Sequence, residues 1–362
     1  MAKTVQVKLG ERSYPIYIGG GVPLASSLKD EKGVKAFVIS DSTVDRLHGE
    51  SCRRRLAELG IETISAVVPA GEASKSMKSV EALYEQAAGS RLDRKSVVVA
   101  LGGGMVGDLA GFVAGTYLRG VRFIQIPTTL LAMVDSSVGG KTGVNLARGK
   151  NLVGVFHQPV EVDADLGLLA TLPPREYVSG LAEVVKYGVI WDAAFFALLE
   201  RRVDDLLRRD QALLEQVVAR CCEIKAEVVA MDEREIGPRA ILNFGHTLGH
   251  AVEKVDGYGR WLHGEAVAIG MHFAALLSVR ARGLSEREAS RIVDVLCRLG
   301  LPLKPAQGDT EEWGRIWDAM LSDKKTIGKR PRLVLAEKLG LVTTGCDVPE
   351  ELLVETWNVC CQ

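Results

Sequence analysis

Two histidines four positions apart, His246 and His250, lie in the segment NFGHTLGH. Residues at this spacing project to the same side of a helix, which favours the two imidazoles as ligands of one metal ion. A helical histidine pair with no acid between them is equally typical of histidines that pack in a core or face solvent. Two further candidate metal ligands are the carboxylate Glu183 in GLAEVVKYG and the imidazole His263 in LHGEAV. A carboxylate with two histidines predicts an open, catalytic zinc site.

Cationic side chains recur beside glycine-rich turns on a nearly neutral chain. The segment VDSSVGGKTGVNLARGKNLVG contains Asp135, Lys141, Lys150 and Asn151, and further cations are Arg119, Lys186, Lys225, Arg239, Lys324 and Lys325. Lys186 follows Glu183 by three residues, a spacing that is most common in surface ion pairs. Lysine and arginine bind phosphate and carboxylate groups through charge-assisted hydrogen bonds. The set therefore predicts a phosphorylated or carboxylated substrate.

Three glycines, Gly102, Gly104 and Gly107, match the pattern G-x-G-x-x-G in the segment SVVVALGGGMVGDLAGF. A β-branched apolar run precedes them, and a helix is expected to begin near Met105. The free N–H groups of such a turn and the helix dipole favour a bound pyrophosphate. The alternative is a turn that only packs tightly, because the pattern alone is weakly specific.

A dinucleotide fold usually places an acidic residue about 20 positions after the glycines, where it binds the ribose. The corresponding segment, RFIQIPTTLLAM, contains no carboxylate. Asp41 after the segment KAFVIS, and Glu72 with Lys75 in AGEASKS, can take this role from upstream. The turn therefore predicts a variant nucleotide-binding fold.

The pattern of elements changes near residue 171. Before it, short β-rich segments such as KAFVIS, SVVVAL and RFIQIP alternate with amphipathic ones, which indicates βαβ units and a parallel sheet. After Pro173 and Pro174, nearly every segment has helical periodicity. We predict an α/β, Rossmann-like nucleotide-binding domain over residues 1–170. We predict an all-α domain over residues 171–362, which carries metal- and substrate-binding residues.

The 362-residue chain has a formal net charge of −1. Its length favours two domains, and its charge argues against nucleic acid or an anionic membrane as a partner. The segment MAKTVQVKLG does not resemble a signal peptide, and no apolar run reaches the roughly 18 residues that span a bilayer. We therefore expect a cytoplasmic protein. Its seven cysteines contain no C-x-x-C pair and are expected to be reduced thiols.

Several long motifs together resemble those of the 3-dehydroquinate synthase family of sugar-phosphate cyclases. They span most of the chain: GGGMVGDLAGFVAGTYLRGVRFIQIPTTLLAMVDSSVGGKTGVN, GLAEVVKYG, DEREIGPRAILNFGHTLGHAVE and HGEAVAIGM. The resemblance implies the shikimate-pathway reaction of aromatic amino acid biosynthesis that converts 3-deoxy-arabino-heptulosonate 7-phosphate to 3-dehydroquinate and phosphate. The implied steps are transient oxidation by bound NAD, phosphate elimination, reduction and an intramolecular aldol closure. A divalent metal, usually Zn²⁺ with Co²⁺ as a substitute, and a homodimer are also implied.

Carried over residue by residue, the resemblance implies three groups of site residues. It assigns the metal to Glu183, His246 and His263, in place of the His246 and His250 pair that the spacing favours. It assigns NAD to Asp41, Glu72, Lys75, Gly102, Gly103, Gly104, Met105, Val106, Gly107, Asp108, Thr128, Thr129, Lys141, Lys150 and Thr171. It assigns substrate and catalysis to Asp135, Lys141, Asn151, Lys186, Lys225, Arg239, Asn243 and His250, with Arg119 reaching the neighbouring subunit's site and one of Lys324 and Lys325 joining them.

The chain differs from the family motif at one position, and two other enzyme activities are alternatives. The chain has Ala70 where the family commonly has the aspartate of D-G-E, so a cofactor contact at this position reaches at most the backbone. The alternatives are another sugar-phosphate cyclase, such as one that forms a valiolone or deoxy-inosose ring, and a metal-dependent glycerol or alcohol dehydrogenase. The cations argue against the dehydrogenase, because its substrate is uncharged. A non-enzymatic binding module would not need a metal set beside a nucleotide turn.

Overall fold

The computed structural model describes residues 2–257, 259–305, 310–321 and 330–362. The chain forms two compact units, one of Met1–Pro173 with Leu214–Arg234 and the other of Pro174–Leu213 with Glu235–Gln362. The predicted single boundary at residue 171 lies close to Pro173, where the first segment of the first unit ends. Most of helix α8 (Gln211–Met231) belongs to the first unit although it follows residue 171.

The first unit is built on a seven-stranded sheet in the order β1-β2-β9-β6-β5-β3-β4. Its strands are β1 (Lys3–Val7), β2 (Tyr14–Gly19), β3 (Lys35–Asp41), β4 (Glu62–Val68), β5 (Val97–Gly102), β6 (Arg122–Pro127) and β9 (Glu161–Asp165). All neighbouring pairs are parallel except the antiparallel pair β1 and β2. Every residue of β5 is buried, as expected for a central parallel strand covered on both faces. The predicted parallel sheet is confirmed.

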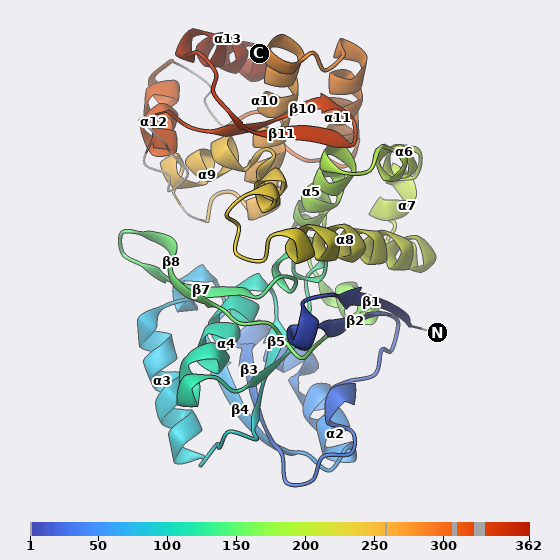
Figure 1. Cartoon of the computed structure of the whole chain (residues 1–362), viewed down its shortest axis with the longest axis vertical. Coiled ribbons are helices and arrows are strands. Elements are labelled where there is room, and N and C mark those ends of the chain that lie inside the picture. Colours follow the sequence, from blue (N-terminus) through green and yellow to red (C-terminus); the bar gives the residue numbers. More distant parts are fainter. Residues whose placement is uncertain (1, 258, 306–309, 322–329) are drawn as a thin grey trace. The chain divides into compact units, whose positions relative to one another are not determined.

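Helices cover both faces of this sheet (Figure 1). Phe37 and Ile39 of β3 pack with α3 (Met77–Gly89) and α4 (Gly104–Thr116). The alternate residues Ala36 and Val38 pack with α2 (Glu50–Glu58) on the other face. The glycine turn follows the C-terminal end of the parallel strand β5, so it lies at the carboxyl edge of the sheet, where ligands bind in folds of this kind. An antiparallel hairpin of β7 (Lys141–Leu146) and β8 (Gly149–Phe156) completes the unit.

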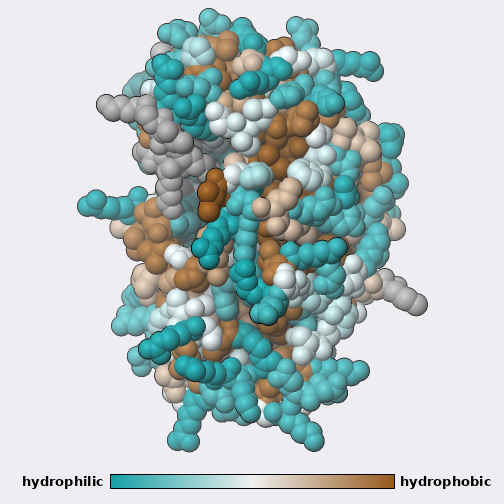
Figure 2. Space-filling model, in the orientation of Figure 1, coloured by the Kyte–Doolittle hydropathy of each residue, from teal (hydrophilic) through white to brown (hydrophobic). Residues whose placement is uncertain are grey.

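The second unit is mainly helical, as predicted. Its helices are α5 (Pro174–Ile190), α6 (Ala193–Arg201), α7 (Val203–Leu207), α9 (His246–Val255), α10 (His263–Arg282), α11 (Glu286–Arg298), α12 (Thr310–Leu321) and α13 (Glu350–Cys361). It also contains a β-hairpin of β10 (Leu333–Lys338) and β11 (Leu341–Cys346), which the prediction of an all-α domain lacks. Among the described residues, none of the helices is long and apolar enough to cross a membrane. Figure 2 shows hydrophilic residues interspersed with hydrophobic ones on the face in view.

Candidate active site

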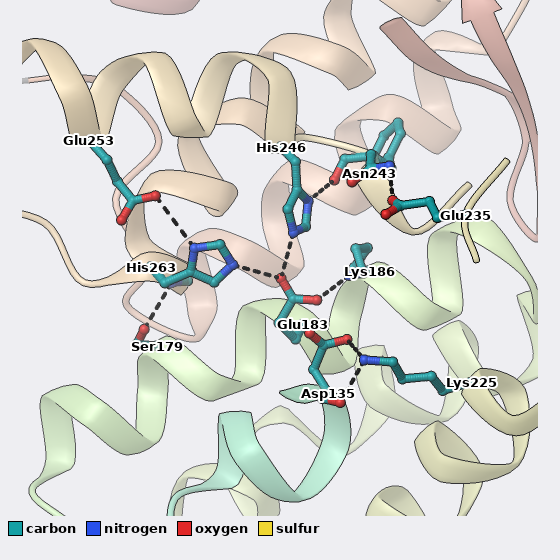
Figure 3. Close-up of polar contacts among 12 residues, drawn as sticks. Asp135, Ser179, Glu183, Lys186, Lys225, Glu235, Asn243, His246, Glu253 and His263 are labelled. Atoms are coloured by element: carbon teal, nitrogen blue, oxygen red, sulfur yellow. Dashed lines mark hydrogen bonds and ion pairs between the residues drawn. The ribbon is translucent and has the colours of Figure 1, made fainter. Parts of the chain in front are cut away.

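Three side chains of the helical unit converge on one point (Figure 3). Glu183 comes from the middle of α5, while His246 and His263 are the first residues of α9 and α10. The Nε2 atoms of His246 and His263 lie 3.4 Å and 3.7 Å from Glu183 Oε1. Their potential ligand atoms all lie within 4.8 Å of one another. The structure thus brings together Glu183, His246 and His263, the set that the resemblance assigns to the metal.

The carboxylate of Glu183 explains why a cation fits this point. It is fully buried, and its Oε1, the oxygen near the two imidazoles, has no hydrogen-bond partner among the described residues. A buried carboxylate oxygen without a partner is costly, and a divalent ion bound by this oxygen and two imidazoles would compensate it. Lys186 forms an ion pair with its second oxygen, and both side chains are buried. The surface ion pair that the spacing suggested is therefore excluded.

Close helix packing places the two histidines. A Cβ added at Gly270 of α10 would lie 1.8 Å from the carbonyl oxygen of Gly245, the residue before His246. A Cβ at Gly264 would lie 1.8 Å from the carbonyl oxygen of Ser179 in α5. These contacts require hydrogen in place of a side chain. They allow α10 to approach both α5 and α9, and so bring His263 toward Glu183 and His246.

Hydrogen-bond partners set the orientation of the imidazoles. Nδ1 of His246 lies 3.2 Å from the carbonyl oxygen of Phe244. A carbonyl only accepts, so Nδ1 donates and Nε2 keeps its lone pair toward Glu183. Nδ1 of His263 lies 3.5 Å from Oε2 of the buried Glu253 in α9. Sequence analysis missed Glu253, although it lies on the helix of His246 and His250 at helical spacing from His250.

His250 lies beside this set without joining it. Its ring centroid is 5.4 Å from that of His246 and 5.9 Å from that of His263. Its potential ligand atoms gather with those of Glu253 and His263 in a second group, which does not include Glu183. Two further predicted residues lie on the turn Pro238–Asn243: Arg239 is buried, and Asn243 donates from Nδ2 to Glu235 Oε1 at 3.1 Å. Lys324 and Lys325 lie outside the described residues.

The glycine turn is in the first unit, where Gly102 ends β5 and Gly104 begins α4. No side chain caps this helix, and its first turn contains no acidic residue, so its free N–H groups suit an anion. A Cβ at Gly103 would lie 3.1 Å from Thr129, and one at Gly104 would lie 3.0 Å from Ser136 Oγ. These glycines keep the backbone accessible to a closely approaching group, which fits the phosphates of a nucleotide.

The remaining residues predicted for NAD lie mostly at the ends of elements in this unit. Asp41 ends β3 and accepts from the backbone N–H of Thr43 at 2.8 Å. Thr128 and Thr129 follow β6, and Thr171 hydrogen-bonds His48 at 2.8 Å. The backbone N–H of Ala70, where the family commonly has aspartate, donates to Ser42 Oγ at 3.2 Å.

An ion pair between the buried Lys75 and the partly exposed Asp108 links two of the predicted NAD residues. Lys75 Nζ contacts the carboxylate of Asp108 and donates to Asn151 Oδ1 at 2.5 Å. Burial raises the pKa of Asp108 above its usual range, and the Lys75 ammonium opposes the increase. Met105, Val106 and Gly107 lie between the turn and Asp108 on α4.

The first unit also holds predicted substrate residues. Lys225 Nζ of α8 donates to Asp135 Oδ1 at 2.7 Å (Figure 3). Lys141, predicted for both NAD and substrate, begins β7, and Lys150, predicted for NAD, lies on β8. Arg119 is exposed after α4, in a turn where φ is 50° at Leu118 and 69° at Arg119. Two successive non-glycine residues in the left-handed region are strained, and such strain is typical of functional sites.

The architecture and the site define the class of protein. The chain resembles two solved sugar-phosphate cyclases at 29% identity. One is a 2-epi-5-epi-valiolone synthase from Streptomyces hygroscopicus with NAD⁺ and Zn²⁺ bound, with a TM-score of 0.88 and 98% of each chain covered. The other is a 2-deoxy-scyllo-inosose synthase complexed with carbaglucose-6-phosphate, NAD⁺ and Co²⁺, with a TM-score of 0.87 and 99% of each chain covered. The fold is therefore that of the sugar-phosphate cyclases.

Sequence comparison defines the family within this class. Residues 65–179 match the 3-dehydroquinate synthase N-terminal model and residues 180–326 match the C-terminal one. The 3-dehydroquinate synthase of Desulforamulus reducens is 50% identical over 96% of this chain and 97% of its own length. That of Halorhodospira halophila is 52% identical over 97% of this chain and 98% of its own length. The chain belongs to the 3-dehydroquinate synthase family.

Proposed function

We propose that the chain is a 3-dehydroquinate synthase, which converts 3-deoxy-arabino-heptulosonate 7-phosphate to 3-dehydroquinate and inorganic phosphate. The observation that carries the proposal is the buried carboxylate of Glu183 with the two imidazoles of His246 and His263, in a chain about half identical to two named synthases over nearly its whole length. The activity places the protein in aromatic amino acid biosynthesis.

Glu183, His246 and His263 would hold the metal, and His250 would face the substrate. The tautomer of His246, which keeps the Nε2 lone pair toward Glu183, supports this assignment. When bound, the zinc or cobalt ion supplies a Lewis acid for the hydroxyl that is oxidised. With three protein ligands, the metal would remain accessible to that hydroxyl.

The first unit would hold NAD at the glycine turn from Gly102 to Asp108. The uncapped N-terminus of α4 supports binding of the pyrophosphate there, with Asp41, Glu72, Lys75, Thr128, Thr129, Lys141, Lys150 and Thr171 as further contacts. When bound, NAD would supply a hydride acceptor that acts catalytically, without net oxidation of the substrate. The proposed reaction therefore consumes no NAD.

The substrate carries a carboxylate and a phosphate, and this chain supplies cations and amides for both. The guanidinium of Arg239 has the planar fork that matches a carboxylate. Lys141, Asn151, Asn243 and His250 would hold the phosphate so that an oxygen of the leaving group takes the substrate proton. Orientation of the leaving group in this way raises its effective concentration beside the proton. Asp135, Lys186 and Lys225 would bind the remaining polar groups, together with one of Lys324 and Lys325.

We also propose a homodimer in which Arg119 reaches the phosphate in the neighbouring subunit's site. The exposed, strained turn at Leu118 and Arg119 supports this proposal. A cytoplasmic location is supported by the seven cysteines, all of which are free thiols, as is typical of a reducing compartment.

The test is turnover by the purified protein with the heptulosonate phosphate, catalytic NAD⁺ and Zn²⁺. We expect equal amounts of inorganic phosphate and dehydroquinate, with no net NADH. Sedoheptulose 7-phosphate, which lacks the carboxylate, and glycerol serve as alternative substrates. Robust cyclisation of the first would identify another sugar-phosphate cyclase. Formation of NADH from the second, with NAD⁺ supplied in excess, would identify a dehydrogenase.

A further inference from the structure

Asn145, in β7, is joined to three residues of the nucleotide-binding unit by three hydrogen bonds. Its Nδ2 donates to Glu72 Oε1 at 2.7 Å. Its Oδ1 accepts from the backbone N–H of Asn151 at 2.9 Å. Its own backbone N–H donates to the carbonyl oxygen of Lys75 at 2.9 Å. One side chain therefore connects residues that lie more than seventy positions apart.

These contacts close a ring. Lys75 is bonded to Asn145 through its backbone, Asn145 to Asn151 through the amide oxygen, and Asn151 back to the Lys75 ammonium at 2.5 Å. The ammonium also contacts Asp108. Asn151 has a φ of 55°, and the bond from its N–H helps to hold this left-handed backbone. A change at Asn145 therefore reaches both Lys75 and Asn151.

We infer that Asn145 is a positioning residue, which fixes Glu72 for the ribose of the nucleotide and Asn151 for the phosphate of the substrate. The inference rests on the proposed function of these two residues. Glu72 is exposed, and a mobile side chain loses rotamer entropy when a ligand immobilises it. The bond from Asn145 restricts Glu72 before the ligand arrives.

The chemistry requires an amide at position 145. The carboxylate of Glu72 needs a donor, and the N–H of Asn151 needs an acceptor; a planar amide offers both. Aspartate would keep the acceptor for Asn151 but would place a second negative charge against Glu72. Alanine would remove both bonds and leave the fold of β7 intact.

The experiment measures the Kd for NAD⁺ by calorimetry and the KM for the heptulosonate phosphate. For Asn145→Ala we expect about a tenfold increase in Kd, equivalent to about 1.4 kcal/mol. For Asn145→Asp we expect a larger increase, because of charge repulsion. For Asn145→Ala we also expect a higher KM.

Gln86→Ala is the matched control, because Gln86 is an exposed side chain in the same unit whose amide donates to the carbonyl oxygen of Ser65 at 2.7 Å. It should leave both constants unchanged. Unchanged Kd and KM in Asn145→Ala would overturn the inference, as would an Asn145→Asp variant that binds NAD⁺ as tightly as the unmodified protein. Failure of the unmodified protein to bind NAD⁺ would instead overturn the proposed function.

Discussion

Glu183 carries the negative charge of the proposed metal set, and His246 and His263 complete it. Three ligands leave none to spare, so Glu183→Ala or His263→Ala should abolish turnover and release the metal. His250→Ala should lose turnover but keep the metal, because its ring lies outside the group around Glu183. Elemental analysis of each purified variant, expressed as metal per chain, measures this. If the His250→Ala protein contained no metal and the His263→Ala protein still contained it, His250 and not His263 would be the metal ligand.

Asp163, a buried carboxylate of the first unit, affects the stability of the protein and not its turnover. Glu161 and Asp163 of β9 are both fully buried. Asp163 Oδ2 accepts from the backbone N–H of Ala25 at 3.0 Å. Burial raises the pKa of Asp163 well above its usual range, and the charge of Glu161 raises it further. Asp163 contributes its full stabilisation at pH values below its pKa in the unfolded chain, which is about 4. This stabilisation is lost as the pH rises toward the higher pKa of Asp163 in the folded protein.

Asp163→Asn removes this dependence on pH and keeps both a donor for Glu161 and an acceptor for Ala25. We expect the variant to gain stability relative to the unmodified protein as pH rises from about 4.5 to 8. A tenfold change in proton affinity corresponds to about 1.4 kcal/mol, so the free energies of unfolding should diverge by that amount or more. Urea unfolding at several pH values measures it. A difference independent of pH would contradict the prediction.

At the scale of elements, the metal set depends on how closely α10 approaches its neighbours. A Cβ at Gly270 would lie 1.8 Å from the carbonyl oxygen of Gly245. Gly270→Ala should therefore separate α10 from α9, weaken metal binding and destabilise the helical unit by about 1–3 kcal/mol. Gly314→Ala in α12 is the matched control, because nothing lies within 4 Å of the added Cβ. It should leave metal binding unchanged and stabilise the helix by roughly 0.5–1 kcal/mol. Thermal unfolding with metal titration compares the two, and equal effects would refute this role of Gly270.

The sequence predicted elements better than it predicted their contacts. The β-branched run before Gly102 indicated a buried strand, and β5 is that strand. The spacing of His246 and His250 indicated a helix, but it could not show that His263, on another helix, lies nearer to Glu183. That proximity depends on contacts such as the one between Gly270 and Gly245, which leave no periodic pattern. Glu253 and Asn145 were missed for the same reason. Their partners are fixed by tertiary structure and not by local spacing.

At the scale of the whole molecule, the proposal that Arg119 acts across a dimer predicts complementation. Arg119→Ala and His263→Ala should each be inactive as homodimers. A heterodimer of the two contains one site with an intact metal set and an arginine from its neighbour. Because random mixing makes half of the dimers mixed, with one working site each, subunit exchange should restore about a quarter of the unmodified activity. Activity before and after exchange measures this, and no recovery would exclude a shared site.

The division of the chain also has a consequence for biosynthesis. The first unit is interrupted after Pro173 and completed by Leu214–Arg234, where Val217, Cys222 and Ile224 of α8 are fully buried. A ribosome that adds about 5–20 residues per second needs roughly 3–12 seconds to reach Arg234 from Pro173. Throughout this interval the nascent nucleotide-binding unit lacks a helix that contributes to its core. Chaperone occupancy of ribosome-bound chains should therefore persist until α8 has left the exit tunnel.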